Sequence, residues 1–223
     1  MIEEREYKRV ITYIKEQITD GNLHTGDKLP TERELGQNLS LGRNSIREAL
    51  RIMEAMGMME SRQGSGNYLS GNIEKTLTES MELMLLIKQV DYFQLSQLRR
   101  AIELFAYQGA LEHYTDLQID ELTNILEKMK QCTGSEKASL DKQFHDKILA
   151  GCENTLIISI MNSLSDVCSS LIEKVVIHSA PAIERMLMEA HEDMVKGIRE
   201  QNLMSGLAAL NRHYDLTDAE ISK

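Results

Sequence analysis

Four residues whose side chains can bind a metal ion fall on the apolar faces of predicted helices. Asp141 and His145 stand four residues apart in one helix. His191 and His213 lie in two later helices. Each follows the helical spacing of the apolar residues around it, so all four are expected to point into one core. Because burying such groups without partners would cost several kcal/mol, the pattern indicates a shared partner.

A divalent metal ion would satisfy all four groups. Asp141 and His145, at positions i and i+4, are neighbours on a helix surface, with roughly 5–6 Å between their Cβ atoms. His191 and His213 would complete a set of one oxygen and three nitrogen ligands. Such a set suits Zn²⁺, Ni²⁺ or Mn²⁺. Ordinary core residues with hydrogen-bond partners are the alternative and would be preferred for any one of the four alone, but the complete set favours the metal.

A second group of residues has the types that read DNA bases. From Leu29 to Leu50 the sequence predicts a helix, a tight turn and a second helix. The second helix begins with Arg43, Asn44, Ser45 and Arg47. In the major groove, Arg pairs with guanine and Asn with adenine through bidentate hydrogen bonds, so these residues predict binding to double-stranded DNA. A three-helix domain that binds protein is the alternative, and the repulsion within the arginine cluster disfavours it.

Residues 1–70 supply the elements that would hold this DNA-reading helix. Apolar residues at helical spacing from Tyr7 to Ile18 predict a first helix. Thr31 followed by Glu34 forms the capping-box pattern at the start of the second helix. Two short strands are predicted around residues 63–66, where glycines permit a tight hairpin. Together these elements make a winged helix-turn-helix domain with a small β-wing.

The rest of the chain is expected to be helical. Only two prolines occur, and 42% of all residues are hydrophobic, so the composition favours a mainly α fold. Residues 71–74 are the predicted linker, and residues 75–223 form the second domain. The six or seven expected helices span residues 73–90, 92–113, 117–132, 135–151, 154–178, 181–201 and 204–221. They predict an antiparallel all-α helical bundle.

Charge is distributed unevenly along the chain. Residues 1–70 hold 10 Lys and Arg against 11 Asp and Glu. Residues 71–223 hold 15 against 24, nearly all of the net charge of −10. Because DNA binding depends on local basic residues that face phosphates, the first part remains able to bind DNA. The acidic second part is not expected to be a nucleic-acid surface.

The sequence is typical of a cytoplasmic protein. Cys132, Cys152 and Cys168 are odd in number and have no CxxC spacing, as expected of reduced thiols. No window contains 18 consecutive apolar residues, so no transmembrane helix and no membrane partner are expected. The first ten residues are charged and do not form the apolar core of a signal peptide.

Motif residues between Gly21 and Leu69 resemble the DNA-binding domain of the GntR family of bacterial repressors. The matching elements are Gly26–Pro30, Glu32–Leu35, Arg43, Ile46–Leu50, Gly57 and Gly64–Gly66. The resemblance implies DNA contacts from Arg33, Arg43, Asn44 and Arg47, a wing near Gln63 and Gly64 that enters the minor groove, and a dimer on a short palindrome. Leu41-Gly42 depart from the family's usual Val followed by Ser or Thr, which removes a hydroxyl that could contact a phosphate.

The second domain is similar to the FCD ligand-binding domain of the FadR subfamily. The matching pieces are Leu98–Glu103, Asp141–His145, Asn154, Ala190–His191 and Arg212–His213. In metal-binding members the pattern D-x-x-x-H and two later histidines carry the metal, and all four positions are filled here. The resemblance also implies a small organic acid as effector, with Arg99 pairing its far end. The alternative for Arg99 is a surface ion pair with Glu103, which is worth little.

These expectations describe a homodimeric regulator, more in keeping with a repressor than an activator, in which an acid bound at the metal alters operator binding. Three alternatives remain open at this point. The metal itself could be the effector, or it could be only a structural staple. The chain could also be a metal-dependent hydrolase, but it lacks HExxH and any other recognised catalytic motif, so it is not expected to be an enzyme.

Overall fold

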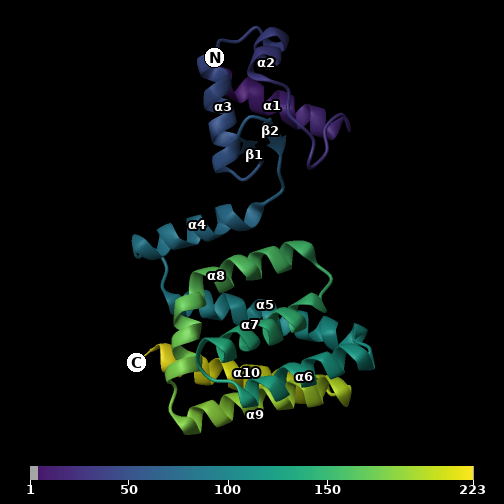
Figure 1. Ribbon diagram of the computed structural model, residues 1–223, viewed down its shortest axis with the longest axis vertical. Coiled ribbons are helices and arrows are strands. Elements are labelled where there is room, and N and C mark those ends of the chain that lie inside the picture. Colours follow the sequence, from purple (N-terminus) through teal and green to yellow (C-terminus); the bar gives the residue numbers. More distant parts are fainter. Residues whose placement is uncertain (1–4, 223) are drawn as a thin grey trace. The chain divides into compact units, whose positions relative to one another are not determined.

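The computed structural model describes residues 5–222 and divides into two compact units with a border between Glu79 and Ser80. Figure 1 labels the elements of both units. The predicted fold class is confirmed: the chain is mainly helical, and two short strands form a small antiparallel sheet in the N-terminal unit.

The N-terminal unit is a winged helix-turn-helix. Its elements are α1 (Glu6–Thr19), α2 (Glu32–Leu39), α3 (Arg43–Ala55), β1 (Met59–Arg62) and β2 (Gly66–Leu69). Apolar residues of the three helices, among them Ile14, Leu35 and Ile46, are completely buried in one core. The strands pair from Met59 opposite Leu69 to Arg62 opposite Gly66, so the wing has a fixed register.

Local signals in the sequence position the two helices of the motif. The capping box predicted at α2 is present: the Thr31 hydroxyl accepts from the Glu34 N–H at 3.3 Å, and the Glu34 carboxylate accepts from the Thr31 N–H at 2.8 Å. Ser40 ends α2 in the left-handed region, at φ 54°. Gly42 then begins α3 as its N-cap and offers no side chain to the helix terminus.

The C-terminal unit is a helical bundle, and the seven described helices from residue 73 onward follow the predicted spans closely. They are α4 (Ile73–Leu86), α5 (Tyr92–His113), α6 (Asp116–Gln131), α7 (Gly134–Ala150), α8 (Thr155–His178), α9 (Pro181–Arg199) and α10 (Leu203–Ile221). The largest difference is at α4, which ends at Leu86, four residues before the predicted position. Lys88, two residues beyond this end, adopts φ 57°. The predicted linker at residues 71–74 overlaps the first turn of α4, and the border between the two units falls inside that helix.

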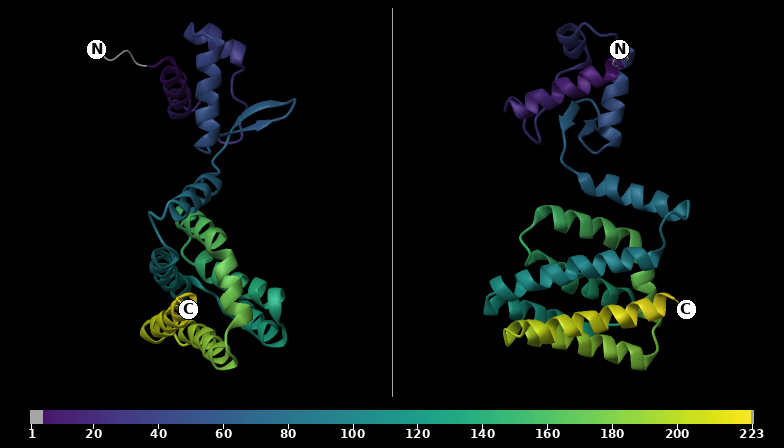
Figure 2. Two further views of the ribbon diagram at one scale, coloured as in Figure 1. Left: turned by 90° about the vertical axis from the view of Figure 1, so that its left-hand side faces the viewer. Right: turned by 180° about the vertical axis from the view of Figure 1, so that it is seen from behind.

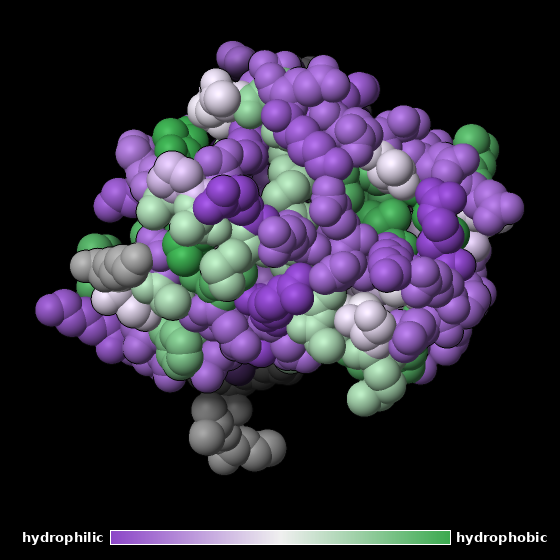
Figure 3. All heavy atoms as spheres, turned by 90° about the horizontal axis from the view of Figure 1, so that it is seen from below, coloured by the Kyte–Doolittle hydropathy of each residue, from purple (hydrophilic) through white to green (hydrophobic). Residues whose placement is uncertain are grey.

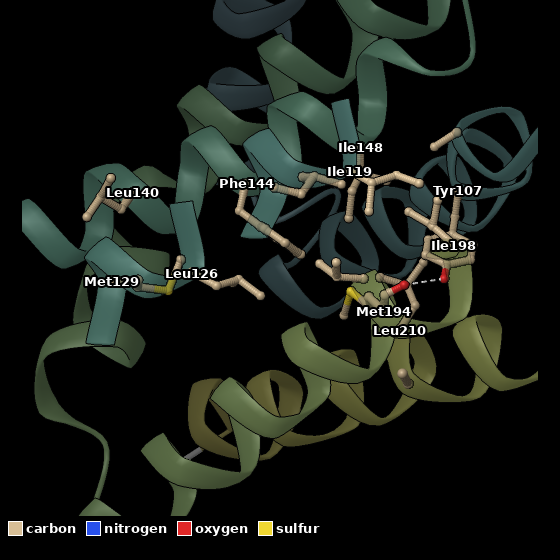
Figure 4. Packing of buried hydrophobic residues seen from close by; sticks show 14 of the residues in the cluster. Tyr107, Ile119, Leu126, Met129, Leu140, Phe144, Ile148, Met194, Ile198 and Leu210 are labelled. Carbon is tan, nitrogen blue, oxygen red and sulfur yellow. Dashed lines mark hydrogen bonds between the residues drawn. The ribbon is translucent and has the colours of Figure 1, made fainter. Parts of the chain in front are cut away.

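The bundle packs around a core to which α5, α6, α7, α9 and α10 contribute. Figure 2 shows α5 and α10 side by side along it, and Figure 4 shows Phe144, Ile148, Met194 and Leu210 within it. The surface seen in Figure 3 is mostly hydrophilic, with small separate hydrophobic areas. By length and composition α8 could span a membrane; 33% of its most apolar window is buried, and the helix packs against α5, α7 and α10.

Tyr107 of α5 fixes the close approach of α9 and α10. Its hydroxyl donates to the Met194 carbonyl at 2.6 Å, a bond drawn in Figure 4. A Cβ added to Gly206 would lie only 1.9 Å from this hydroxyl, and one added to Gly197 would lie 2.8 Å from the Gly206 Cα. Glycine is therefore required at both positions by the space available, since any side chain would push Tyr107 or the neighbouring helix away.

Candidate metal centre and nucleic-acid interface

The residues expected to contact DNA lie on exposed parts of the N-terminal unit. Arg43, Asn44 and Arg47 are exposed at the start of α3, and Ser45 is half-buried. Arg33 is exposed on α2, and Gln63 and Gly64 form the exposed turn between β1 and β2. The structure thus presents the start of one helix and the tip of one hairpin, the two parts that a winged helix-turn-helix inserts into DNA grooves.

Two of these residues have protein partners in the free molecule. Arg47 forms an ion pair with Glu32 at 2.9 Å, with both side chains more than a third exposed. The Ser45 hydroxyl donates to the carboxylate of Glu6. An exposed ion pair contributes little to stability, so a DNA phosphate or base can replace Glu32 as the partner of Arg47 at small cost.

Basic residues beside the wing extend the predicted interface. The Arg62 guanidinium lies 4.2 Å from the centre of the Tyr68 ring and pairs with Glu60. The backbone of Lys28 forms an isolated β-bridge with that of Tyr68, and the Lys28 side chain passes close to Gly66. Neither basic residue belonged to the predicted set. Lys28 is part of a matched motif and Arg62 directly precedes Gln63, so a search for basic residues next to the turn would have found both.

In the C-terminal unit the three predicted histidine ligands converge. His145 on α7, His191 on α9 and His213 on α10 are buried, and one potential ligand atom of each lies within 4.8 Å of the others. Asp141 Oδ1 lies 3.5 Å from His191 Nε2, and Asp141 Oδ2 lies 4.0 Å from His145 Nε2. The three histidines, up to 68 residues apart in the sequence, therefore meet at one point where they can share an ion, and Asp141 lies beside two of them.

The protonation of this cluster fits a metal ion. Burial lowers the pKa of His191 and that of His213 well below the usual value, so both imidazoles are neutral, which is the form that binds metals. The Nε2 atoms of His145 and His191 are 3.2 Å apart, a distance that leaves room for one shared proton. Among the described residues, Nδ1 of His191 and Nδ1 of His213 have no hydrogen-bond partner. Two neutral imidazoles, with a third imidazole and a carboxylate beside them, suit a divalent cation.

Glu103 on α5 is a buried member of the site that the sequence interpretation did not assign to it. The carboxylate accepts hydrogen bonds from His145 Nδ1 and, at 2.7 Å, from the Tyr214 hydroxyl. Burial alone would raise the pKa of Glu103, but the charge and hydrogen bond of His145 hold it below its usual value. The same contact raises the pKa of His145 although burial opposes it. Glu103 thus gives Nδ1 of the proposed ligand His145 a charged hydrogen-bond partner.

The alternative of a surface ion pair between Arg99 and Glu103 is wrong. Arg99 is 9% exposed and Glu103 is fully buried, because the face of α5 that carries both packs into the bundle. The Arg99 Nε atom is buried without a hydrogen-bond partner among the described residues. A buried guanidinium nitrogen that lacks an acceptor is costly, and an anion would satisfy it.

Arg99 also lines a cavity of about 300 Å³ that reaches the proposed ligands Asp141 and His145. Helices α7 and α8 contribute most of the lining, which includes four serines: Ser135, Ser139, Ser165 and Ser169. A cavity of this size is at the small end of those that bind metabolites. Arg99 and two of the proposed ligands, Asp141 and His145, therefore border the same space, in which one small molecule can touch all three.

Comparison with known proteins identifies both units. The family described as bacterial regulatory proteins, gntR family, matches residues 6–69, and the FCD domain matches residues 94–216. The chain belongs to the GntR family. Its FCD-type second domain places it in the FadR subfamily, as the sequence motifs predicted.

Relatives of this GntR-family protein extend over nearly the whole chain. The transcriptional regulator LutR of Bacillus subtilis is 27% identical over 91% of this chain and 94% of its own length. The Uxu operon regulator of Haemophilus influenzae is 26% identical over 97% and 85%. A putative L-lactate dehydrogenase operon regulatory protein of Escherichia coli is 26% identical over 83% and 74%. These proteins are transcription regulators and not enzymes, which agrees with the prediction and leaves the hydrolase alternative without support.

Solved structures show the same fold. The GntR protein of Streptococcus agalactiae has a TM-score of 0.67 at 23% identity, with 96% of this chain and 99% of that chain covered. McbR/YncC of E. coli has a TM-score of 0.52 at 17% identity, with 97% of each chain covered. These likenesses show that this GntR-family protein shares its fold with solved structures over nearly its whole length.

Proposed function

We propose that this GntR-family regulator is a homodimeric, cytoplasmic repressor whose operator binding is controlled by a small carboxylate bound at a divalent metal. Asp141, His145, His191 and His213 would hold the metal, with Zn²⁺, Ni²⁺ or Mn²⁺ as candidates. The observation that carries the proposal is that Arg99, whose Nε has no partner among the described residues, lines one cavity together with Asp141 and His145. Four protein ligands leave positions on an octahedral ion for the acid.

The balance of buried charge favours a carboxylate effector. When a bound ion keeps the imidazoles neutral, the buried charges around it are the carboxylates of Asp141 and Glu103 and the guanidinium of Arg99, since the buried Lys137 pairs with Glu184. A divalent ion would leave this cluster with one excess positive charge. Because uncompensated buried charge is unfavourable, a single carboxylate that bridges the metal and Arg99 would complete the site. The name of the E. coli relative, which refers to an L-lactate dehydrogenase operon, is in keeping with an organic acid.

The proposed mechanism is a population shift. The acid would bind one arrangement of the bundle more tightly than another and so change the fraction of dimers whose two reading helices match the operator spacing. Arg33, Arg43, Asn44, Ser45 and Arg47 would contact the duplex, and Gln63 and Gly64 would bring the wing to the minor groove. Regulation would then need no contact between effector and DNA.

The exposed face of α5 is suited to pairing with a second copy. Leu98 is 46% exposed, Phe105 is 56% exposed, and Ala101 lies exposed between them. Leu98 and Phe105 lie three and four residues on either side of Ala101. An antiparallel crossing at Ala101 would place Phe105 against Leu98 of the partner subunit, as a two-fold axis requires. This arrangement supplies the two DNA-reading units that a palindrome needs.

The pairing can be tested by exchanging charges across the two-fold axis. Sedimentation velocity should show that Leu98→Lys alone and Phe105→Glu alone dissociate the dimer. The double variant should restore it, because Lys would then face Glu of the partner subunit. Dimers that persist in both single variants would show that the subunits pair elsewhere.

Metal content and operator binding test the regulatory proposal together. Mass spectrometry should find about one ion per chain in the wild type, and none in His145→Ala or His191→Ala. His113→Ala, which changes an exposed histidine at the end of α5, is the matched control and should retain the ion. Small carboxylates should then alter operator binding only when the metal is present.

Different results distinguish the remaining alternatives. Operator binding that follows free metal without any acid would make the metal the effector. An effector response that survives in metal-free, folded protein would leave the ion a structural staple. Wild-type protein that binds no divalent ion would overturn the metal site itself.

A further inference from the structure

Glu103 joins the three helices that surround the proposed metal site. It lies on α5, fully buried, with His145 of α7 on one carboxylate oxygen and Tyr214 of α10 on the other. Tyr214 directly follows the proposed ligand His213. Glu103 therefore contacts the proposed ligand His145 and the neighbour of the proposed ligand His213, and these hydrogen bonds engage both of its oxygens.

The hydrogen bond from His145 fixes which of its nitrogens faces the other ligands. When Nδ1 carries the proton and donates it to Glu103, the lone pair of Nε2 is free. Nε2 is the atom that lies 3.2 Å from His191 Nε2 and 4.0 Å from Asp141 Oδ2. The tautomer that Glu103 selects is therefore the one that can coordinate an ion at the centre of the cluster.

The three histidines differ in this respect. Nδ1 of His191 and Nδ1 of His213 have no hydrogen-bond partner among the residues described, whereas Nδ1 of His145 has a buried carboxylate. Carboxylates that accept from a metal-bound histidine orient its ring and increase its basicity. His145 is thus the histidine ligand of the cluster that the protein holds ready before the ion arrives.

We infer that Glu103 is a positioning residue that selects the metal-binding tautomer of His145, with Tyr214 holding its second oxygen. The inference rests on the proposed metal site and concerns how that site obtains its affinity. Loss of an outer partner of this kind lowers metal affinity by about 10–100-fold. If Glu103 served only to fill the core, its substitution would change the stability of the fold and leave the geometry at the ion unaltered.

Two substitutions separate positioning from simple charge. Glu103→Gln keeps the shape but removes the charge, and its amide group can donate to Nδ1 and so stabilise the wrong tautomer. Glu103→Asp keeps the charge but shortens the side chain by one methylene, so the contact with His145 is lost. Glu112→Gln, on the exposed side of α5, is the matched control. Tyr214→Phe removes the second hydrogen bond and should weaken metal binding less than Glu103→Gln.

Co²⁺ is a suitable probe because its visible absorption reports ligand geometry. In full-length protein, both Glu103 variants should bind Co²⁺ about 10–100-fold more weakly and with an altered spectrum, while Glu112→Gln matches the wild type. Circular dichroism of the metal-free proteins checks folding. If the Glu103 variants do not fold, Tyr214→Phe decides in their place, because its weaker binding and altered spectrum test the same hydrogen-bond chain.

The opposite results are equally clear. Wild-type affinity and spectrum in Glu103→Gln, or in Tyr214→Phe when that variant decides, would overturn the positioning role. Wild-type behaviour of Glu103→Asp would show that charge alone matters, which also overturns it. Wild-type protein that binds no Co²⁺ would instead overturn the metal site on which the inference rests, and is thereby distinguished from the other outcomes.

Discussion

The two units place their functional residues in opposite environments. In the N-terminal unit Arg43, Asn44 and Arg47 are exposed, and their partner in function is a DNA duplex outside the protein. In the C-terminal unit His191 and Glu103 are almost or completely buried, and their partners must come from the protein or from a ligand that enters it. Substitutions in the first unit should therefore change binding with little effect on folding. Substitutions in the second should change folding and binding together.

Removal of the metal should produce the largest effect and should be confined to the C-terminal unit. An ion that binds only the folded protein at about 1,000 times its Kd stabilises it by about 4 kcal/mol. Calorimetry with and without a chelator should show a lower melting temperature for the bundle and an unchanged transition for the N-terminal unit. His191→Ala should abolish the dependence on the chelator. An equal shift in both transitions would mean that the two units unfold as one.

Arg43→Ala should show the converse behaviour. Loss of a bidentate base contact costs about 1–3 kcal/mol of binding, which is about a 5–160-fold weaker operator affinity. The melting temperature and metal content should stay at their wild-type values, because the side chain is exposed. Arg51→Ala, further along α3 and also exposed, is the control for general loss of charge. If both variants weaken operator binding equally, Arg43 contributes only charge and reads no base.

Gly206→Ala tests the tight packing that is particular to the bundle. The added methyl group would overlap the Tyr107 hydroxyl, so the variant should unfold about 1–3 kcal/mol more easily. Met204→Ala, which truncates a side chain that is 76% exposed on the same helix, should change the free energy of unfolding very little. Chemical denaturation measures both. A stable Gly206→Ala protein would indicate that α9 and α10 can separate without penalty.

The contrast between the units also explains what the sequence could predict. The helices and the wing were predicted well because local signals determine them: the Thr31 and Glu34 capping box and the glycines of the hairpin act within a few residues. The histidine cluster was predictable because polar residues stood on apolar faces. Glu103 met the same criterion, since it shares a face of α5 with Leu95 and Ala106, but its i, i+4 spacing from Arg99 suggested a surface ion pair.

Tertiary contacts determine the rest, and no local pattern encodes them. The pairing of Glu103 with His145 and Tyr214 joins residues 42 and 111 positions apart. The cavity beside Arg99 depends on how α7 and α8 lie against each other. Such contacts follow from how helices cross, which several packing geometries satisfy equally well at the level of sequence.

The smallest predicted effect is at Gly42, where local structure in the N-terminal unit can be improved. Gly42 is the N-cap of α3 at φ −70° and ψ 152°, and a Cβ added there meets no atom within 4 Å. Gly42→Ser supplies a hydroxyl that can accept from the first turn, which should stabilise the unit by a few tenths of a kcal/mol to about 1 kcal/mol. Gly42→Ala provides the same restriction of the unfolded chain without the hydroxyl and should be less stable than the serine variant. Equal stability of the two would show that water already satisfies the N–H groups of α3, the groups expected to face a DNA phosphate.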